Sequence, residues 1–290
     1  MIEFTIPELV DFAPLSADPR ECRVVNEPLE EFLRRRLAAL PDGTEWSMDY
    51  IPDPELPALL AAAGAFEVRD GSSVLAGFGA ERKVFDFSGL RLRYPWDLLA
   101  LNEREVAKIE RSEIRGELSP AAHVDGVLVL GEGSRVLPGV YVEGKVVIGR
   151  GCKIGPNCYL RGNTVIGDDC HVGQAVEIKN SVIGNRTAVG HLSYVGDSVL
   201  GDRVNFGAGT IIGNLRHDGA NHRSMIGGSL VDTGRRKFGA IVGNSVHTGI
   251  HTAIYPGRKL AAGSSTRPGE IVSHDLLLFD EKRSKTRKAR

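Results

Sequence analysis

Residues 148–177 read IGRGCK-IGPNCY-LRGNTV-IGDDCH-VGQAVE when the chain is cut into blocks of six. Every block opens with isoleucine, leucine or valine, and glycine usually follows. The same frame runs back to Val124 and forward to Ile211, and it resumes over 242–265. Two blocks, IKNSV and VGDSV, are one residue shorter. A repeat sustained over this length indicates a solenoid.

The period of six also predicts the shape of the solenoid. One block supplies one short strand and one turn, and three blocks close a triangular coil of about 18 residues. The opening aliphatic residue points into the prism, where coils stack at strand spacing, and glycine relieves the tight corner beside it. An amphipathic helix does not have this pattern, because six is not a multiple of 3.6. We therefore expect a mainly β chain built on a left-handed parallel β-helix.

Residues 1–93 lack the repeat and differ from it in kind. The segments 28–40 and 54–64 have helical patterns, and SSVLAGF and KVFDF have the composition of short strands. This mixture predicts a small N-terminal α/β domain, whose role the sequence does not reveal. The following residues, 94–112, begin YPWDLL and predict a connecting helix with proline in its first turn.

The β-helix is then expected over 113–272, with one interruption at 214–237. A long excursion from a regular solenoid is more often functional than idle, because such loops form binding walls or clasp neighbours. The basic tail, 273–290, is expected to be a solvated, disordered end.

Composition narrows the classes of function. The formal net charge is −1, which gives no support to a general nucleic-acid or membrane-surface binder. No apolar run approaches the length of a membrane span, and the first residues do not resemble a secretory signal. The four cysteines lack the paired spacing of a metal site and are expected to be reduced core residues: Cys22, Cys152, Cys158 and Cys170. We expect a cytoplasmic protein with no metal, nucleic-acid or membrane partner.

The repeat also predicts which side chains stack on one another. Positions three blocks apart share a column, and a shorter block reduces that spacing by one. One inward column contains Leu160, Ile178, Val195 and Ile212, and the outward column next to it contains Arg161, Lys179, Gly196 and Gly213. Stacked like charges destabilise a sheet unless they are neutralised, and Glu177 could do this in part. We expect the glycines to leave open space, so that the two cations suit a phosphate; the alternative is two ordinary solvated cations.

A second stretch of interest is VGHLSYVGD, residues 189–197. His191 lies two positions after the inward Val189, so it is expected at a turn. Tyr159, Glu177 and Tyr194 fall at the corner that leads to the cationic pair. A lone histidine at a turn is more often inert surface than a catalyst, but the placement of His191 on the coil next to the cationic pair leaves both readings open.

Residues 176–214, VEIKNSVIGNRTAVGHLSYVGDSVLGDRVNFGAGTIIGN, resemble a known family at the informative positions. The stretch is similar to the acetyltransferase domain of the bifunctional glucosamine-1-phosphate acetyltransferase / N-acetylglucosamine-1-phosphate uridylyltransferases. The NLRHDG, DTGRRK and YPWDLL segments are similar to the archaeal-type sugar-1-phosphate nucleotidylyltransferase/acetyltransferases. The resemblance runs from about Tyr94 to about Val272. It implies a homotrimeric, acetyl-CoA-dependent N-acetyltransferase that acts on an amino-sugar 1-phosphate, either glucosamine-1-phosphate or galactosamine-1-phosphate, in nucleotide-sugar precursor synthesis.

The resemblance also implies roles for single residues. The histidine of GHL-x-Y is the family's general base, which here is His191. Six residues match phosphate-binding or sugar-binding positions or lie beside them: Arg161, Lys179, Glu177, Tyr194, Asn205 and Asn214. A backbone N–H or Asn214 could support the oxyanion. Acetyl-CoA lies along the last coils between subunits in this family, which points to Gly239, Ala240, Gly249 and Ala261. Acetyl transfer in the family requires no metal.

Two features depart from the family pattern. The family's N-terminal half is a nucleotidylyltransferase, about twice the length of residues 1–93, that begins with a G-x-G-T-R-type loop and a lysine. Neither is found here, so we expect no uridylyltransferase activity in this chain. The segment after GAGT also differs from the Asn-Tyr-Asp-Gly of many bacterial members, which leaves the identity of the amino sugar open.

Two other readings stay open. One is a catalytically degenerate trimeric scaffold or sugar-phosphate-binding module on the same fold. The other is a zinc hydro-lyase of the carbonic anhydrase type, which needs three converging histidines. The candidate histidines do not fall three blocks apart, the spacing that would stack them: His171, His191, His217 and His222.

Overall fold

The computed structural model describes residues 1–276. The chain divides into two compact units, one made of Met1–Phe12 with Ser16–Asp97 and one made of Ala13–Leu15 with the chain from Leu98 onward. Most of the predicted basic tail, residues 277–290, lies outside the described residues. No helix within residues 1–276 is long and apolar enough to cross a membrane.

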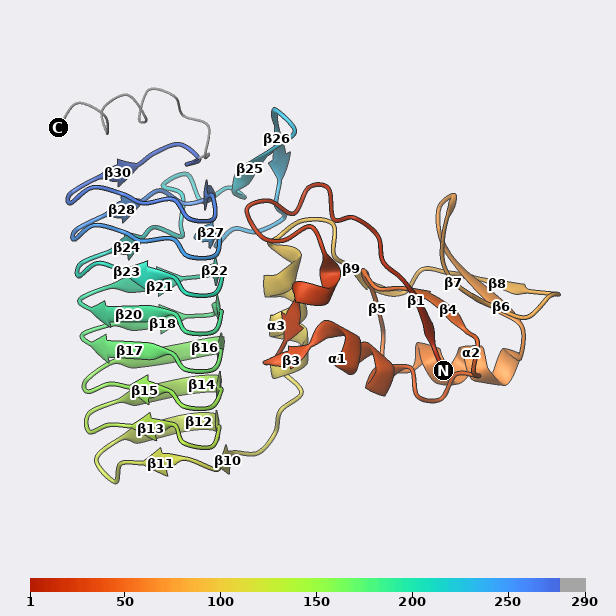
Figure 1. Ribbon diagram of the computed structural model, residues 1–290, viewed down its shortest axis with the longest axis horizontal. Helices are drawn as coiled ribbons and strands as arrows, with labels where there is room; N and C mark the ends of the chain where they lie inside the picture. Colours follow the sequence, from red (N-terminus) through yellow and green to blue (C-terminus); the bar gives the residue numbers. More distant parts are fainter. Residues whose placement is uncertain (277–290) are drawn as a thin grey trace. The chain divides into compact units, whose positions relative to one another are not determined.

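The larger unit is the predicted parallel β-helix, which is confirmed as a stack of coils in Figure 1. Two faces belong to one sheet of thirteen strands: β10 (Glu113–Ile114), β12 (His123–Leu130), β14 (Tyr141–Ile148), β16 (Tyr159–Ile166), β18 (Glu177–Lys179), β19 (Val182–Ile183), β21 (Tyr194–Gly196), β22 (Val199–Leu200), β24 (Ile211–Ile212), β27 (Ala240–Val242), β28 (Ala253–Ile254), β29 (Arg258–Leu260) and β30 (Ile271–Val272). The third face is a sheet of six strands: β11 (Glu117–Leu118), β13 (Arg135–Val136), β15 (Lys153–Ile154), β17 (His171–Gln174), β20 (Ala188–His191) and β23 (Asn205–Phe206).

The corner between the first two faces is a bend inside single strands in the early coils. β16 pairs in parallel with β18 through its first half and with β19 through its second half. Gly162 lies between the halves with φ +70°, a conformation that glycine adopts without strain. From β18 onward a non-glycine residue stands at this corner, Asn180 at φ +48° and then Asp197 at φ +48°. Asparagine and aspartate are the side chains that tolerate this region best.

The interior of the prism is the apolar column that the repeat predicts. Leu160, Ile178, Val195 and Ile212 are each fully buried. The four cysteines are also buried and reduced, as expected. Burial of one such aliphatic side chain contributes about 1.5–3 kcal/mol to the free energy of unfolding, so the column stabilises each coil of the stack.

The β-helix extends beyond residue 272. The N–H of Leu276 donates to the carbonyl of Lys259 at 2.8 Å, and the N–H of Ala261 donates to the carbonyl of Leu276 at 2.8 Å. The expectation that the solvated tail begins at residue 273 was therefore wrong, because Leu276 is apolar and packs on the last coil.

The excursion over 214–237 contains an antiparallel hairpin that was not predicted. Its strands are β25 (Arg223–Ile226) and β26 (Ser229–Asp232), which are joined by Gly227 and Gly228. Both glycines have positive φ, as a tight two-residue hairpin turn requires. The excursion closes where the N–H of Phe238 donates to the carbonyl of Asn214 at 3.0 Å.

The connecting helix is α3 (Asp97–Val106), which is shorter than the predicted span 94–112. It begins at Asp97, whose carboxylate accepts the backbone N–H groups of Arg93 and Tyr94 at 2.8 Å. From Leu98 onward α3 belongs to the β-helix unit, and the side-chain amide of Asn102 donates to the carbonyl of Asn163 at 2.9 Å.

The smaller unit is the predicted α/β domain. Its helices are α1 (Leu29–Arg36) and α2 (Leu56–Ala63), and a 3-10 turn covers Pro19–Glu21. Its main sheet has the order β1 (Glu3–Thr5), β4 (Glu45–Ser47), β7 (Ser73–Phe78), β6 (Phe66–Asp70) and β8 (Lys83–Asp86). Two further pairs are β2 (Arg23–Val24) with β3 (Glu27–Pro28) and β5 (Tyr50–Pro52) with β9 (Gly89–Arg91). The rings of Trp46 and Tyr50 stack at 4.9 Å in its core, and both are fully buried.

Candidate functional site

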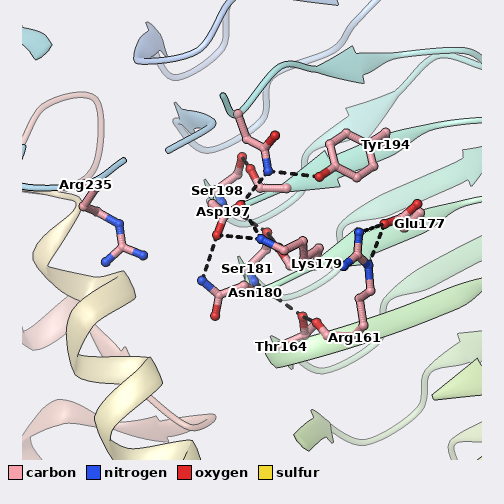
Figure 2. Close-up of polar contacts among 12 residues, drawn as sticks. Arg161, Thr164, Glu177, Lys179, Asn180, Ser181, Tyr194, Asp197, Ser198 and Arg235 are labelled. Atoms are coloured by element: carbon pink, nitrogen blue, oxygen red, sulfur yellow. Dashed lines mark hydrogen bonds and ion pairs between the residues drawn. The ribbon is translucent and has the colours of Figure 1, made fainter. Parts of the chain in front are cut away.

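The two predicted cations lie on neighbouring strands in register. Arg161 of β16 is the direct partner of Lys179 of β18, as their spacing of three full blocks requires. Lys179 is in turn the partner of Gly196 on β21. Figure 2 shows both basic side chains on the same outward face of the coil.

Arg161 is neutralised by the carboxylate that the sequence suggested. Its Nε and Nη2 both lie 2.7 Å from Oε1 of Glu177. Both side chains are about one-third exposed (33% and 32%), so the pair can be opened by a ligand at modest cost. The guanidinium also lies over the ring of Tyr159, 5.3 Å from its centroid.

Lys179 is neutralised by Asp197, which the sequence did not single out. Nζ of Lys179 lies 2.9 Å from Oδ2 and 3.2 Å from Oδ1 of Asp197. The carboxylate is almost wholly buried, with 3% of the side chain exposed. It also accepts the side-chain amides of Asn180 at 3.0 Å and Asn214 at 2.6 Å. Asp197 lies one coil after Asn180, so the period of the repeat could have predicted that the two residues share a corner column.

The space next to Gly196 is not open, which corrects one expectation. A Cβ atom on Gly196 would lie 2.5 Å from the hydroxyl of Tyr194 and 2.6 Å from Nδ2 of Asn214. These two groups are hydrogen-bonded at 3.0 Å and fill the space. A side chain at this position would displace these two groups. At Gly213, the nearest atom to a Cβ would be Cδ of Pro256 at 3.3 Å.

Asn214 has no amide hydrogen left for an oxyanion. Its Nδ2 carries two hydrogens, and both are directed, one to Tyr194 and one to Asp197. Its Oδ1 remains available as an acceptor. The geometry therefore assigns Asn214 to positioning Tyr194, rather than to the oxyanion role that was expected.

A buried ladder of hydroxyl groups supports the strand ends that carry the site (Figure 2). The side chains of Thr164, Ser181 and Ser198 donate to the carbonyls of Arg161, Lys179 and Gly196, each at 2.8 Å. The N–H of Ser198 donates to the hydroxyl of Ser181 at 3.1 Å. The three hydroxyl residues are fully buried and recur once per coil. Their regular spacing in the sequence is the signal that could have predicted this ladder.

The excursion is attached to the same corner through His222. Its Nε2 lies 3.2 Å from the carbonyl oxygen of Asn214, and the histidine is 2% exposed. Burial lowers the pKa of His222. The neutral ring then donates from Nε2 to this carbonyl, which holds the base of the excursion against the strand that carries Asn214.

An open groove of about 520 Å³ lies at the corner next to the Arg161–Glu177 pair. The groove is lined by aromatic, polar and small residues, among them Tyr141, Tyr159, Glu177, Leu192, Ser193 and Tyr194. Burial raises the pKa of Tyr194, and the charge of Asp197 acts in the same direction. The phenol is therefore a hydrogen-bond donor at neutral pH.

His191 lies at a turn, as predicted. It is the last residue of β20, it is exposed, and Leu192 follows it in the left-handed region at φ +52°. Among the described residues no hydrogen bond of its imidazole is found, and His191 lies on the six-stranded sheet, whereas Arg161 and Lys179 lie on the thirteen-stranded sheet. Its neighbours Leu192 and Ser193 line the groove.

Asn205 is exposed on β23, where it is the register partner of Ala188. Within residues 1–276 no hydrogen bond connects its side chain to the cationic pair. One chain therefore brings together Arg161, Glu177, Lys179, Tyr194 and Asn214, whereas His191 and Asn205 lie on strands of the six-stranded sheet.

Two of the four positions expected to contact acetyl-CoA are interior. Ala240 is fully buried in the core of the prism. Gly239 is also buried, and a Cβ on it would lie 2.1 Å from the carbonyl oxygen of Gly196. Neither residue exposes a side chain to a ligand, and contact of acetyl-CoA with this part of the chain stays a prediction. Gly249 and Ala261 are half-buried at the surface.

No group of three or more histidine, cysteine, aspartate or glutamate side chains in residues 1–276 could hold a metal ion. The pKa of His171 is lowered by burial and by the charges of Lys153 and His191. The described part of the chain therefore lacks the three converging zinc ligands that a zinc hydro-lyase would need.

Comparisons with known proteins agree with the resemblance seen in residues 176–214. Residues 142–257 match the family model described as the GMPPB C-terminal domain. The chain is 36% identical over 219 residues to the bifunctional sugar-1-phosphate nucleotidylyltransferase/acetyltransferase of Sulfurisphaera tokodaii, a match that covers 75% of this chain and 54% of that protein. It is 43% identical over 183 residues to the bifunctional protein GlmU of Methanococcus maripaludis strain C7, covering 63% of this chain and 44% of that protein.

The chain spans about half the length of the curated relatives it matches. A solved structure of UDP-N-acetylglucosamine acyltransferase aligns with 56% of this chain and 67% of that chain, with 14% identity and a TM-score of 0.27. A likeness at that score has no functional implication.

Proposed function

We propose that this protein is an N-acetyltransferase that moves the acetyl group of acetyl-CoA to the 2-amine of an amino-sugar 1-phosphate. The observation that carries the proposal is the register of Arg161 and Lys179, with Tyr194 and Asn214 fixed beside them. The names of the relatives support the reaction class, since both acetyl transfer and sugar 1-phosphates appear in the first of them.

The cationic pair is suited to the phosphate. Arginine offers a planar fork and lysine a point charge, and together they match the charge of a phosphate monoester. Glu177 is one-third exposed and holds Arg161 only until a stronger anion arrives. Lys179 keeps Asp197 as its buried partner, and the ammonium retains one further N–H that can donate to the phosphate.

His191 is the proposed general base. The amine must lose a proton to attack the thioester, and a histidine titrates in the range where this is effective. The nitrogen lone pair forms the C–N bond, the proton passes to His191, and the C–S bond breaks to release coenzyme A. No enzyme nucleophile is needed, because a thiolate is a good leaving group.

We infer a homotrimer because His191 and the cationic pair lie on different sheets of the same chain. Three β-helices side by side would place each site between two chains, with Gly249 and Ala261 facing the acetyl-CoA. The adjoining groove next to Tyr194 would receive the sugar. No metal takes part in this proposed step.

The proposal is tested by measuring thiol release from acetyl-CoA with glucosamine-1-phosphate and with galactosamine-1-phosphate. The parent protein should turn over with one of them, and His191→Ala should lose turnover while light scattering gives an unchanged assembly. Equal turnover by the variant would remove His191 from the mechanism. Tight sugar-phosphate binding without any turnover in the parent would instead favour a binding module.

A further inference from the structure

We propose that Asp197 is the positioning residue of this site, which fixes both the phosphate-binding lysine and the tyrosine that faces the sugar. The inference rests on the proposed function and assigns a role to a residue that does not touch the substrate. It starts from one carboxylate with three donors, Lys179, Asn180 and Asn214.

The burial of Asp197 makes these contacts obligatory. A carboxylate with 3% of its surface exposed has almost no water to replace a lost partner. One ammonium and two amides satisfy its two oxygens, so each donor is held at a fixed place around it. The carboxylate therefore fixes the positions of the side chains that donate to it, and a water molecule could not take its place as the acceptor.

The consequence for Lys179 is a fixed direction. A lysine side chain ordinarily samples many rotamers, but here the ammonium spans both oxygens of Asp197 at 2.9 and 3.2 Å. The side chain is only 15% exposed. Two of the three N–H bonds are thus used, and the third is the one left for a phosphate oxygen beside Arg161.

The consequence for Tyr194 passes through Asn214. Nδ2 of Asn214 is held at 2.6 Å by Oδ2 of Asp197, and its other hydrogen points to the hydroxyl of Tyr194 at 3.0 Å. The tyrosine hydroxyl accepts this bond and keeps its own hydrogen for a ligand in the groove. Without the carboxylate, the amide of Asn214 is free to rotate and the hydroxyl loses its fixed partner.

Asp197 has a backbone role that can be separated from its charge. Its N–H donates to the carbonyl of Lys179, and its carbonyl accepts the N–H of Gly239, both at 2.8 Å. Its φ of +48° is a conformation that asparagine also tolerates. Asp197→Asn therefore keeps the turn and removes the charge. Of the two terminal atoms of the asparagine side chain, only Oδ1 can accept a hydrogen bond.

The test compares Asp197→Asn with Asp169→Asn, which makes the same change at an exposed corner residue of similar φ, +57°. Asp197→Asn should raise the KM for the sugar phosphate about tenfold or more and leave the KM for acetyl-CoA within about twofold, because it loses charge-assisted hydrogen bonds only on the side that binds the sugar phosphate. Asp169→Asn should change neither. The effect should shrink in a Lys179→Ala background, since the two residues act together.

An unchanged KM for the sugar phosphate in Asp197→Asn would overturn the proposal, as would an equal loss for both substrates. Should that variant not fold, Asp197→Ser takes its place; loss of the folded protein in both would make Asp197 a stability residue only. If the parent acetylates no amino sugar, the proposed function fails, and calorimetric titration with inorganic phosphate then judges Asp197 separately. Weaker phosphate binding by the variant than by the parent supports its role, and equal or absent binding in both overturns it.

Discussion

Nδ2 of Asn180 lies 2.6 Å from Oε1 of Glu103, although the two residues are far apart in the chain. The same amide donates to Asp197 at 3.0 Å, and Glu103 also accepts Nη1 of Arg235 at 3.2 Å. Glu103 of α3 thus ties the corner of the site to the excursion that carries Arg235. Figure 2 shows Arg235 near α3 and apart from the cationic pair.

Glu103→Ala should loosen the excursion. Arg235 is 16% exposed, and its Nε is buried without a hydrogen-bond partner in the described part of the chain. Removing the carboxylate leaves this guanidinium without its anion. We expect a loss of about 1–3 kcal/mol in the free energy of unfolding and faster tryptic cleavage within 214–237.

The matched control is Glu113→Ala, which removes the carboxylate of an exposed pair with Arg115. Such a pair contributes ~0–1 kcal/mol, so its melting temperature should stay close to that of the parent. Equal shifts in the two variants would mean that Glu103 does not clamp the excursion.

The four cysteines should be unreactive in the folded protein. All are buried, and burial raises the pKa of Cys22 and of Cys158 to about 12 in each case. The hydrogen bond with Cys170 lowers the pKa of Cys152, but only 2% of Cys152 is exposed to a reagent. Because the thiolate is the reactive form, an aromatic disulfide reagent at neutral pH should label none of them rapidly. Four thiols should appear in guanidinium. Ser265→Cys, at an exposed position, should react at once and serves as the control; a native cysteine that reacts as fast would contradict the burial.

The period of the repeat predicts those features of the site that depend only on the stacking of the backbone coils. The inward column, the register of Arg161 with Lys179, and the turn at His191 all follow from the stacking of every third block. Asp197 is also in register, but its role depends on three side chains that meet around it, which spacing does not reveal. The same limit applies to Gly196, where the period predicts open space and the Tyr194 hydroxyl fills it.

The sequence of the excursion contains a signal for its hairpin. Residues 223–232 read RSMIGGSLVD, in which a Gly-Gly pair separates two short strand-like runs. That pattern is typical of a two-residue hairpin, which the structure contains as β25 and β26. The contact of Glu103 with Asn180 could not be predicted in this way, because it joins a helix to a coil far along the chain.

The stability of the excursion should fall in mild acid because of His222. Burial lowers its pKa, so below about pH 6.5 the unfolded chain binds a proton that the folded chain does not. The contribution of the neutral His222 to stability is therefore complete above the pKa that this histidine has in the unfolded chain. It is lost as the pH falls toward the lower pKa of His222 in the folded chain. The melting temperature should decrease from pH 7 to pH 5.

His222→Gln should flatten that dependence, since glutamine does not titrate and its amide can still donate to the carbonyl of Asn214. His217→Gln changes an exposed histidine of the same excursion and should leave the slope unaltered. Parallel melting curves for the parent and His222→Gln over this range would assign the acid sensitivity to another group.

Gly196→Ala should impair the site without disturbing the coil. The new methyl group would lie 2.5 Å from the Tyr194 hydroxyl and 2.6 Å from Nδ2 of Asn214, closer than such atoms can approach. Both must move, which breaks their hydrogen bond and withdraws Asn214 from Asp197. We expect kcat/KM for the sugar phosphate to fall about tenfold or more, from the loss of these bonds. Gly190→Ala is the control on the preceding strand, because a Cβ there meets nothing within 4 Å. A similar loss in both variants would show that the coil, and not the contact with Tyr194 and Asn214, is sensitive to an added methyl group.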